Sequence, residues 1–148
     1  MKKILILSLL FFTGCSSTSY KTMTCSRTTN KMGVSMDLSY TIKYSDDIVS
    51  EIESVEKLRS NDINKLNDLK NEFENLYRDY NGADYYTYNV SLENNTLTNT
   101  YSIVYNRDDT NTLLKVAQSG KSFSKVGRVN LDSLLSYYKS VGVTCEKK

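Results

Sequence analysis

The chain has 148 residues, with 19 basic and 17 acidic side chains, twelve tyrosines and three cysteines, and it lacks histidine, tryptophan and proline. This length suits one domain with a single core. The lack of histidine argues against hydrolases of the Ser-His-Asp or Cys-His type and against ordinary zinc sites. The basic residues form no clustered footprint of the kind that nucleic-acid binding needs, so we expect no nucleic-acid partner. We also expect no metal and no cofactor.

The N-terminal segment is typical of a bacterial export signal. Lys2 and Lys3 precede an apolar run from Ile4 to Phe12, which is far shorter than the roughly 20 residues that span a bilayer. The following Thr13-Gly14-Cys15 resembles a lipobox, in which the cysteine is acylated and becomes the first residue of the mature chain. Phe12 stands where most lipoboxes carry leucine. An ordinary signal peptide cut elsewhere and a buried cysteine are the alternatives.

The lipobox interpretation divides the chain into a signal peptide at 1–14, a short tether at 15–19 and one domain at 20–148. Palmitate-type acyl chains on Cys15, each buried CH₂ contributing about 0.8 kcal/mol, would hold the protein on the outer side of a bacterial membrane. Loss of Lys2 and Lys3 leaves 17 basic and 17 acidic side chains, so the mature chain is formally neutral. We expect it to be a monomer.

Two cysteines remain, Cys25 and Cys145. An even pair in an exported chain predicts a disulfide, which would tie the first element of the domain to the last. Free buried thiols and a redox pair are alternatives, although a redox pair usually shows CxxC spacing.

The first half of the domain predicts three strands and a helix. Strict alternation over Val34 to Tyr44 is the clearest pattern, and it indicates a half-buried strand. The segment Ile48 to Leu58 is ambiguous because Ile48, Ile52 and Val55 fit helical spacing, but we favour a strand. The predicted elements are a strand at Tyr20 to Thr28, a turn at Asn30 to Gly33, the strand at Val34 to Tyr44, a turn at Ser45 to Asp47, a strand at Ile48 to Leu58, and an amphipathic helix between Asn61 and Tyr80.

We expect Ser60 or Asn61 to cap that helix, with Asp62 in its first turn and Asn81-Gly82 at its end. The second half predicts a hairpin, two helices and an extended tail. Asn94 and Asn95 tolerate the positive φ that a two-residue type I′ turn requires. The predicted elements are strands at Tyr85 to Glu93 and Thr96 to Asn106, a short helix at Thr112 to Ala117, a loop at Gln118 to Gly127, a helix at Leu131 to Val141 capped by Asn130, and an extended segment at Val143 to Glu146.

Together these elements predict an α+β fold, with an antiparallel sheet of about five strands in the order β-β-β-α-β-β-α and helices packed on one face. The lipobox, the cysteine in the first strand, GVSMDLSYTIKY, the long helix ending in YNGADYYTY, the hairpin and the C-terminal SVGVTC resemble the YehR-like family of small uncharacterised bacterial lipoproteins. The resemblance implies an antiparallel α+β domain on a lipid anchor, and it carries no catalytic residue over to this chain.

Residues with chemical potential have simpler structural explanations. The acids Asp46-Asp47, Asp84 and Asp108-Asp109 fall at turns or element ends, where solvated loop acids are usual, although a carboxylate-only enzyme remains an alternative. The loop Asn106 to Asn111 is rich in oxygen ligands, but its spacing does not match an EF-hand, and capping of a helix explains it. Tyr85 and Tyr137 lie out of phase with the apolar faces, which predicts exposed or rim positions and a possible recognition surface.

The sequence therefore predicts a non-enzymatic, membrane-anchored binding or envelope-associated module whose protein or small-molecule ligand is unknown. The alternatives are an inhibitor or immunity-type protein that binds another protein and, less favoured, the carboxylate-only enzyme.

Overall fold

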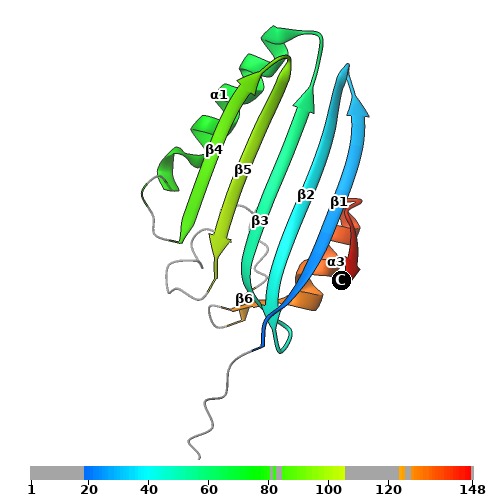
Figure 1. Ribbon diagram of the computed structural model, residues 1–148, viewed down its shortest axis with the longest axis vertical. Coiled ribbons are helices and arrows are strands. Elements are labelled where there is room, and N and C mark those ends of the chain that lie inside the picture. Colours follow the sequence, from blue (N-terminus) through cyan, green and yellow to red (C-terminus); the bar gives the residue numbers. More distant parts are fainter. Residues whose placement is uncertain (1–18, 81, 83–84, 106–123, 126–127, 148) are drawn as a thin grey trace, which may run out of the picture.

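The computed structural model describes residues 19–80, 82, 85–105, 124–125 and 128–147 (Figure 1). The elements in chain order are β1 (Lys21–Lys31), β2 (Val34–Ser45), β3 (Ile48–Arg59), α1 (Ile63–Tyr77), the 3₁₀ turn η1 (Arg78–Tyr80), β4 (Tyr86–Glu93), β5 (Thr96–Val104), β6 (Ser124–Lys125), β7 (Arg128–Asn130), α3 (Leu131–Ser140) and β8 (Thr144–Lys147). The predicted helix at Thr112 to Ala117 lies outside the described residues.

The strands form one antiparallel sheet whose main path runs β4-β5-β3-β2-β1-β8. Near the start of β3, β7 takes up the same edge that β5 occupies further along, and β6 pairs with β7. The ambiguous segment Ile48 to Leu58 is therefore a strand, at the centre of the sheet, as its hairpin position favours. The α+β class and the antiparallel sheet agree with the sequence.

The predicted strand count and order are wrong, since the described residues form eight strands rather than about five. The predicted extended tail at Val143 to Glu146 includes most of β8, which pairs with β1 over Met23 to Ser26. The small strand β6 falls in the predicted loop at Gln118 to Gly127. Strands of two to four residues show no period-two pattern, and they exist because a longer strand offers them an edge.

Three tight turns set the register of the hairpins. Met32-Gly33, Asp46-Asp47 and Asn94-Asn95 all have positive φ at both residues, between 47° and 78°. Two-residue turns of this conformation match the right-handed twist of antiparallel strands. The predicted Asn94-Asn95 hairpin is confirmed, and its register places Leu92 opposite Leu97 and Tyr88 opposite Tyr101.

The predicted cap of α1 is wrong. Asp62 is the N-cap, and its side chain accepts hydrogen bonds from the backbone N–H groups of Asn64 and Lys65. Ser60 is occupied elsewhere, because its hydroxyl donates to the Gly33 carbonyl at 3.0 Å and accepts from the Asp62 N–H. The cap of α3 is as predicted, with the Asn130 side chain accepting from the Ser133 N–H at 3.0 Å.

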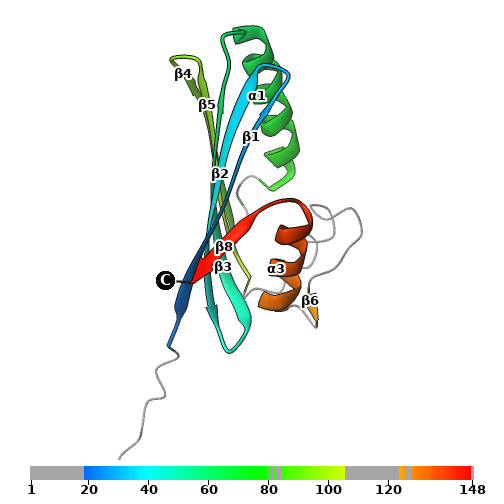
Figure 2. The same ribbon diagram turned by 90° about the vertical axis from the view of Figure 1, so that its right-hand side faces the viewer.

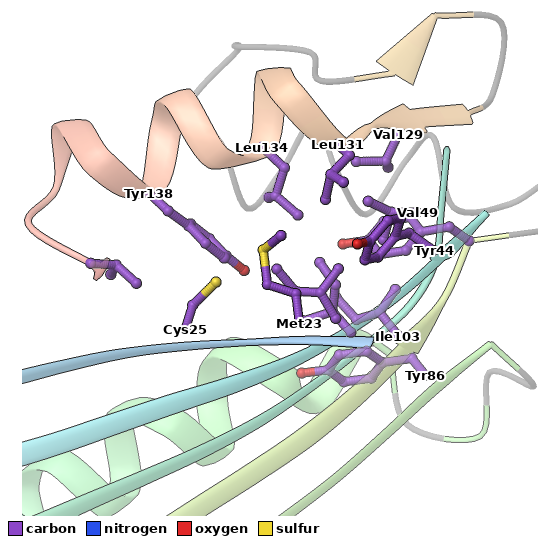
Figure 3. Close-up of a cluster of buried hydrophobic side chains, with 14 residues drawn as sticks. Met23, Cys25, Tyr44, Val49, Tyr86, Ile103, Val129, Leu131, Leu134 and Tyr138 are labelled. Atoms are coloured by element: carbon purple, nitrogen blue, oxygen red, sulfur yellow. The ribbon is translucent and has the colours of Figure 1, made fainter. Parts of the chain in front are cut away.

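The two α-helices among the described residues lie on the same side of the sheet, α1 beside β4 and β5 and α3 near the other end (Figure 2). Two buried clusters result. The α1 cluster consists of Leu58, Leu66 and Leu97 with half-buried neighbours that include Met36, Leu69 and Phe73. The α3 cluster is larger, and in Figure 3 Leu131, Leu134 and Tyr138 of α3 point toward the sheet residues Met23 and Cys25. Predicted helix positions Ile63 and Leu76 face outward, 43% and 56% exposed.

Candidate functional site

The cysteine pair lies at the edge of the α3 cluster. Cys25 of β1 and Cys145 of β8 are directly opposite in the strand register, and their sulfurs are 2.08 Å apart, a disulfide distance. The bridge joins residues 120 positions apart. In the chain-entropy model a loop of this length adds about 4–5 kcal/mol to stability. The lipidation residue Cys15 lies outside the described residues.

The two tyrosines predicted as a recognition surface lie at the rim of the core. Tyr85 and Tyr137 are both half-buried and pack against the α3 cluster. The Tyr85 carbonyl accepts a hydrogen bond from the Val104 N–H at 2.9 Å, and the Tyr137 ring lies 6.1 Å from the ring of Tyr138. Their role in recognition stays a prediction.

The acidic candidates do not converge in the described structure. Asp46 and Asp47 are the exposed residues of the β2–β3 turn, and Asp84, Asp108-Asp109 and the Asn106 to Asn111 loop lie outside the described residues. Within the described ranges, no group of three or more His, Cys, Asp or Glu side chains is placed to share a metal ion. The helices described are too short or too polar to cross a bilayer.

A band of polar side chains crosses the helix-covered face of the sheet. We call Ser54, Glu56 and Asn99 the polar belt. Ser54 and Glu56 alternate with exposed residues on β3 and fall between Ile52 and Leu58, which are core positions. Asn99 lies opposite Glu56 on β5. The belt therefore separates the α1 cluster, at Leu58 and Leu97, from the α3 cluster, at Ile52 and Ile103.

The belt is only partly satisfied in its hydrogen bonds. Asn99 is fully buried, and its Nδ2 lies 3.5 Å from Glu56 Oε2 and 3.3 Å from Tyr77 Oη. Asn99 Oδ1, Ser54 Oγ and the hydroxyl of neighbouring Tyr86 have no hydrogen-bond partner among the described residues. A buried polar atom without a partner costs about 1–3 kcal/mol, and native proteins contain few of them.

Tyrosine rings surround the belt. The ring of Tyr77, from α1, lies 5.5 Å from Tyr88 and 6.0 Å from Tyr101. The ring of Tyr86 completes the group, 5.8 Å from Tyr77. On the β2 side, Tyr40 lies directly opposite Ser54 and stacks on Tyr138 at 4.6 Å. The belt thus has aromatic walls contributed by a helix and three strands.

The belt carries one negative charge at the edge of the apolar interior. Burial raises the pKa of the Glu56 carboxyl, and the hydrogen bond with Asn99 offsets part of that rise. Burial likewise raises the pKa of Tyr40 to about 12 and raises that of Tyr77, and the Glu56 carboxylate adds to both shifts. Glu56 Oε2 and Tyr77 Oη both accept from the Asn99 amide, and Tyr40 lies on β2, the strand next to that of Glu56.

A surface hollow adjoins the belt. Its volume is about 780 Å³, and it is lined by side chains that include Asn75 of α1, Arg78 of η1, and Tyr88 and Val90 of β4. Tyr88 and Val90 are the register partners of Tyr101 and Asn99 on β5. The hollow and the belt are thus one strand spacing apart, and Tyr88 is common to the hollow and the ring group.

The sequence contained a signal for this site that the prediction did not use. In the period-two pattern of β3, Ser54 and Glu56 occupy the apolar phase, and in β5 Asn99 falls between Leu97 and Tyr101. Polar residues in core phase on two strands are unusual, because buried polar groups need partners. Their pairing opposite each other, however, depends on the order of the strands in the sheet.

The fold has counterparts among solved structures. The NMR structure of the YehR protein from Escherichia coli is 15% identical, with a TM-score of 0.57 over 84% of this chain and 90% of that one. The NMR structure of a protein from Streptococcus pneumoniae TIGR4 is also 15% identical, with a TM-score of 0.52 over 99% of this chain and 96% of that one. No protein-family model and no curated protein matches the chain. The chain therefore shares the fold of the YehR protein, as its resemblance to the YehR-like family implies.

Proposed function

We propose that this protein is a lipid-anchored, non-enzymatic binding module on the outer side of a bacterial membrane, and that its ligand binds at the polar belt. The anchor is the thiol of Cys15, which the lipobox-like Thr13-Gly14-Cys15 places directly after a short export signal. The resemblance to a lipoprotein family supports the same location.

The observation that carries the binding role is Asn99 Oδ1, which is fully buried beside the Glu56 carboxylate and has no hydrogen-bond partner among the described residues. An apolar pair at these two positions would avoid the cost of burying polar groups. Proteins keep costly polar constellations mainly where function requires them, and stabilising replacements are then easy to find. A ligand that donates hydrogen bonds would supply the missing partners.

Replacement of the pair tests this role without knowledge of the ligand. Asn99→Leu and Glu56→Met are close in shape to the native residues, and we expect the double variant of the full chain to have an unchanged free energy of unfolding or one about 1 kcal/mol higher. Urea denaturation followed by circular dichroism measures it. A loss of more than about 2 kcal/mol would mean that the belt serves the fold, and the binding role would be withdrawn.

The anchor has a separate test. Cys15→Ala in a bacterial host should abolish acylation and release the protein from the membrane fraction. Mass spectrometry of the mature N-terminal peptide should find acyl chains on the wild-type protein. Membrane retention of an unacylated wild-type chain would contradict the lipid anchor. It would not bear on the proposal that the ligand binds at the polar belt.

The edge strand β4 favours a second candidate, an inhibitor or immunity-type protein. Within the described residues β4 pairs only with β5, so its other edge offers free backbone groups to a partner strand. A photo-crosslinking residue at exposed Thr87 on β4 should then give one discrete adduct in cells. The same residue at exposed Thr41, inside the sheet on β2, should not, and equal labelling at both positions would reject this candidate.

A further inference from the structure

The charge of the belt has no counterpart among the described residues. The hydrogen-bond partner of Glu56 there is the Asn99 amide, and none of the four ion pairs includes Glu56. Lys57 follows Glu56 on the strand and so projects from the opposite face. Arg27, two strands away on the same face, donates to the Val141 carbonyl at 2.6 Å. The described belt therefore has an excess of negative charge.

The groups around Glu56 suit a positively charged group. Asn99 Oδ1 can only accept hydrogen bonds, and the Glu56 carboxylate when ionised is likewise an acceptor. The rings of Tyr77 and Tyr40 add π faces, and such faces attract ammonium ions at distances up to about 6 Å. An anion would be repelled by Glu56, and a neutral ligand would leave its charge uncompensated.

We infer that the polar belt binds an organic ammonium group, a primary amine or a quaternary ammonium, which pairs with the Glu56 carboxylate against the faces of Tyr77 and Tyr40; this rests on the proposed binding function. Glu56 is half-buried rather than fully buried. The adjoining hollow at Tyr88 and Val90 provides room for the remainder of a larger ligand.

The raised pKa of Glu56 makes this binding depend on pH. The groups that face Glu56 are Tyr40 of β2, Tyr77 of α1 and, on β5, Asn99 and Tyr101; the tyrosines have pKa values raised by burial and stay neutral at pH 7. Glu56 is therefore the group whose ionisation controls the charge of the belt. Binding should strengthen as the pH rises through its pKa.

The test uses the full chain in a nonionic detergent, with tetramethylammonium and methylammonium chloride as probes. Tert-butanol serves as the neutral control, and sodium chloride keeps the ionic strength constant. NMR of the Asn99 side-chain amide, assigned by its absence in Asn99→Leu, reports on the belt. We expect a saturable shift at pH 7.5 with at least one of the two ammonium probes and none with tert-butanol.

Two variants with the same change of charge identify the residue responsible. Glu56→Gln should weaken binding by roughly tenfold or more. Glu53→Gln, an exposed position of β3 on the opposite face, should leave the affinity unchanged. No saturable shift with either ammonium probe, an equal shift with tert-butanol, or equal affinity in wild type and Glu56→Gln would overturn the inference. The proposed function would still stand if the double belt variant kept its stability, because that measurement involves no ligand.

Discussion

Glu56 and Asn99 lie directly opposite each other on β3 and β5, with Asn99 Nδ2 3.5 Å from Glu56 Oε2. The pair occupies the core-facing side of the sheet, yet the acceptor oxygen of Asn99 has no partner in the described structure. The next rung of this face on one side is the apolar Leu58–Leu97 pair, and the next on the other side pairs Ser54 with Tyr101. Burying this pair of Glu56 and Asn99 therefore lowers the free energy of unfolding, and this cost is the basis of the binding role that we propose.

Glu56→Gln should make the protein more stable, and more so at neutral than at acidic pH. The folded-state pKa of Glu56 is raised by burial above its unfolded value, which lies near 4.3. The folded state therefore binds the proton more tightly, and the wild-type free energy of unfolding falls as the pH rises through the folded pKa. Glutamine does not titrate, so the Glu56→Gln variant lacks this pH-dependent loss of stability.

Urea denaturation of both proteins between acidic and neutral pH measures this difference in stability. Glu53→Gln on the opposite, exposed face provides the matched control, and its difference from wild type should not follow the same curve. A Glu56→Gln difference that is constant across the pH range would contradict the burial of the Glu56 charge.

Loss of the disulfide should cost about 2–5 kcal/mol. The bridge from Cys25 to Cys145 closes a ring of nearly the whole domain, so it restricts the unfolded chain strongly. The measurement compares urea denaturation of the wild type, with and without reductant, with that of the Cys25→Ser/Cys145→Ser double variant. Equal stability of the oxidised and reduced forms would be the contrary result, as would labelling of either thiol in the unreduced, unfolded protein.

Met32→Asn should stabilise the β1–β2 hairpin. Met32 is 91% exposed and has a φ of 52°, a left-handed conformation that residues with a β-carbon rarely adopt. Asparagine tolerates this conformation, and followed by Gly33 it forms the favoured type I′ pair. We expect a gain of about 0.5–1 kcal/mol in thermal or urea unfolding. Met32→Leu keeps the strain and should give no gain; equal effects of the two substitutions would refute this explanation.

Alkaline unfolding should be steep and coupled to tyrosine ionisation. Burial raises the pKa of Tyr40 to about 12 and raises those of Tyr101 and Tyr138 well above the ordinary value. Their contribution to stability is complete below the unfolded pKa near 10 and is lost as the pH rises through the folded values. Tyrosinate absorbance and circular dichroism should therefore change together above pH 10. Complete ionisation of the tyrosines with an unchanged dichroism signal would contradict their burial.

The sequence predicts the parts of this fold whose causes are local. Val34 to Tyr44 alternates because one face of β2 packs against the core clusters, with Val34 and Met36 half-buried and Ile42 and Tyr44 buried. Asn94-Asn95 turns because asparagine accepts positive φ. The cap of α3 at Asn130 follows from the same kind of local chemistry. The cap of α1 was misassigned because the choice between Ser60 and Asp62 depends on Gly33, which is distant in sequence.

The polar belt explains why the sequence of β3 is ambiguous between helix and strand. Ser54 and Glu56 replace apolar residues in its core phase, so the remaining Ile48, Ile52 and Val55 imitate helical spacing. The opposition of Glu56 and Asn99 arises only when β5 is placed beside β3. The short strands β6, β7 and β8 are non-local in the same sense, since each exists through pairing with an edge that another segment provides.

The most direct test of the binding site is the pKa of Glu56 itself, followed by NMR of its side-chain carboxyl carbon in the full chain. The signal is assigned by its absence in Glu56→Gln. We predict that the carboxyl titrates above its ordinary value in the free protein and that saturating tetramethylammonium lowers its pKa, because a cation that binds the ionised form must favour that form. A Glu56 pKa that is the same with and without the cation would contradict the account.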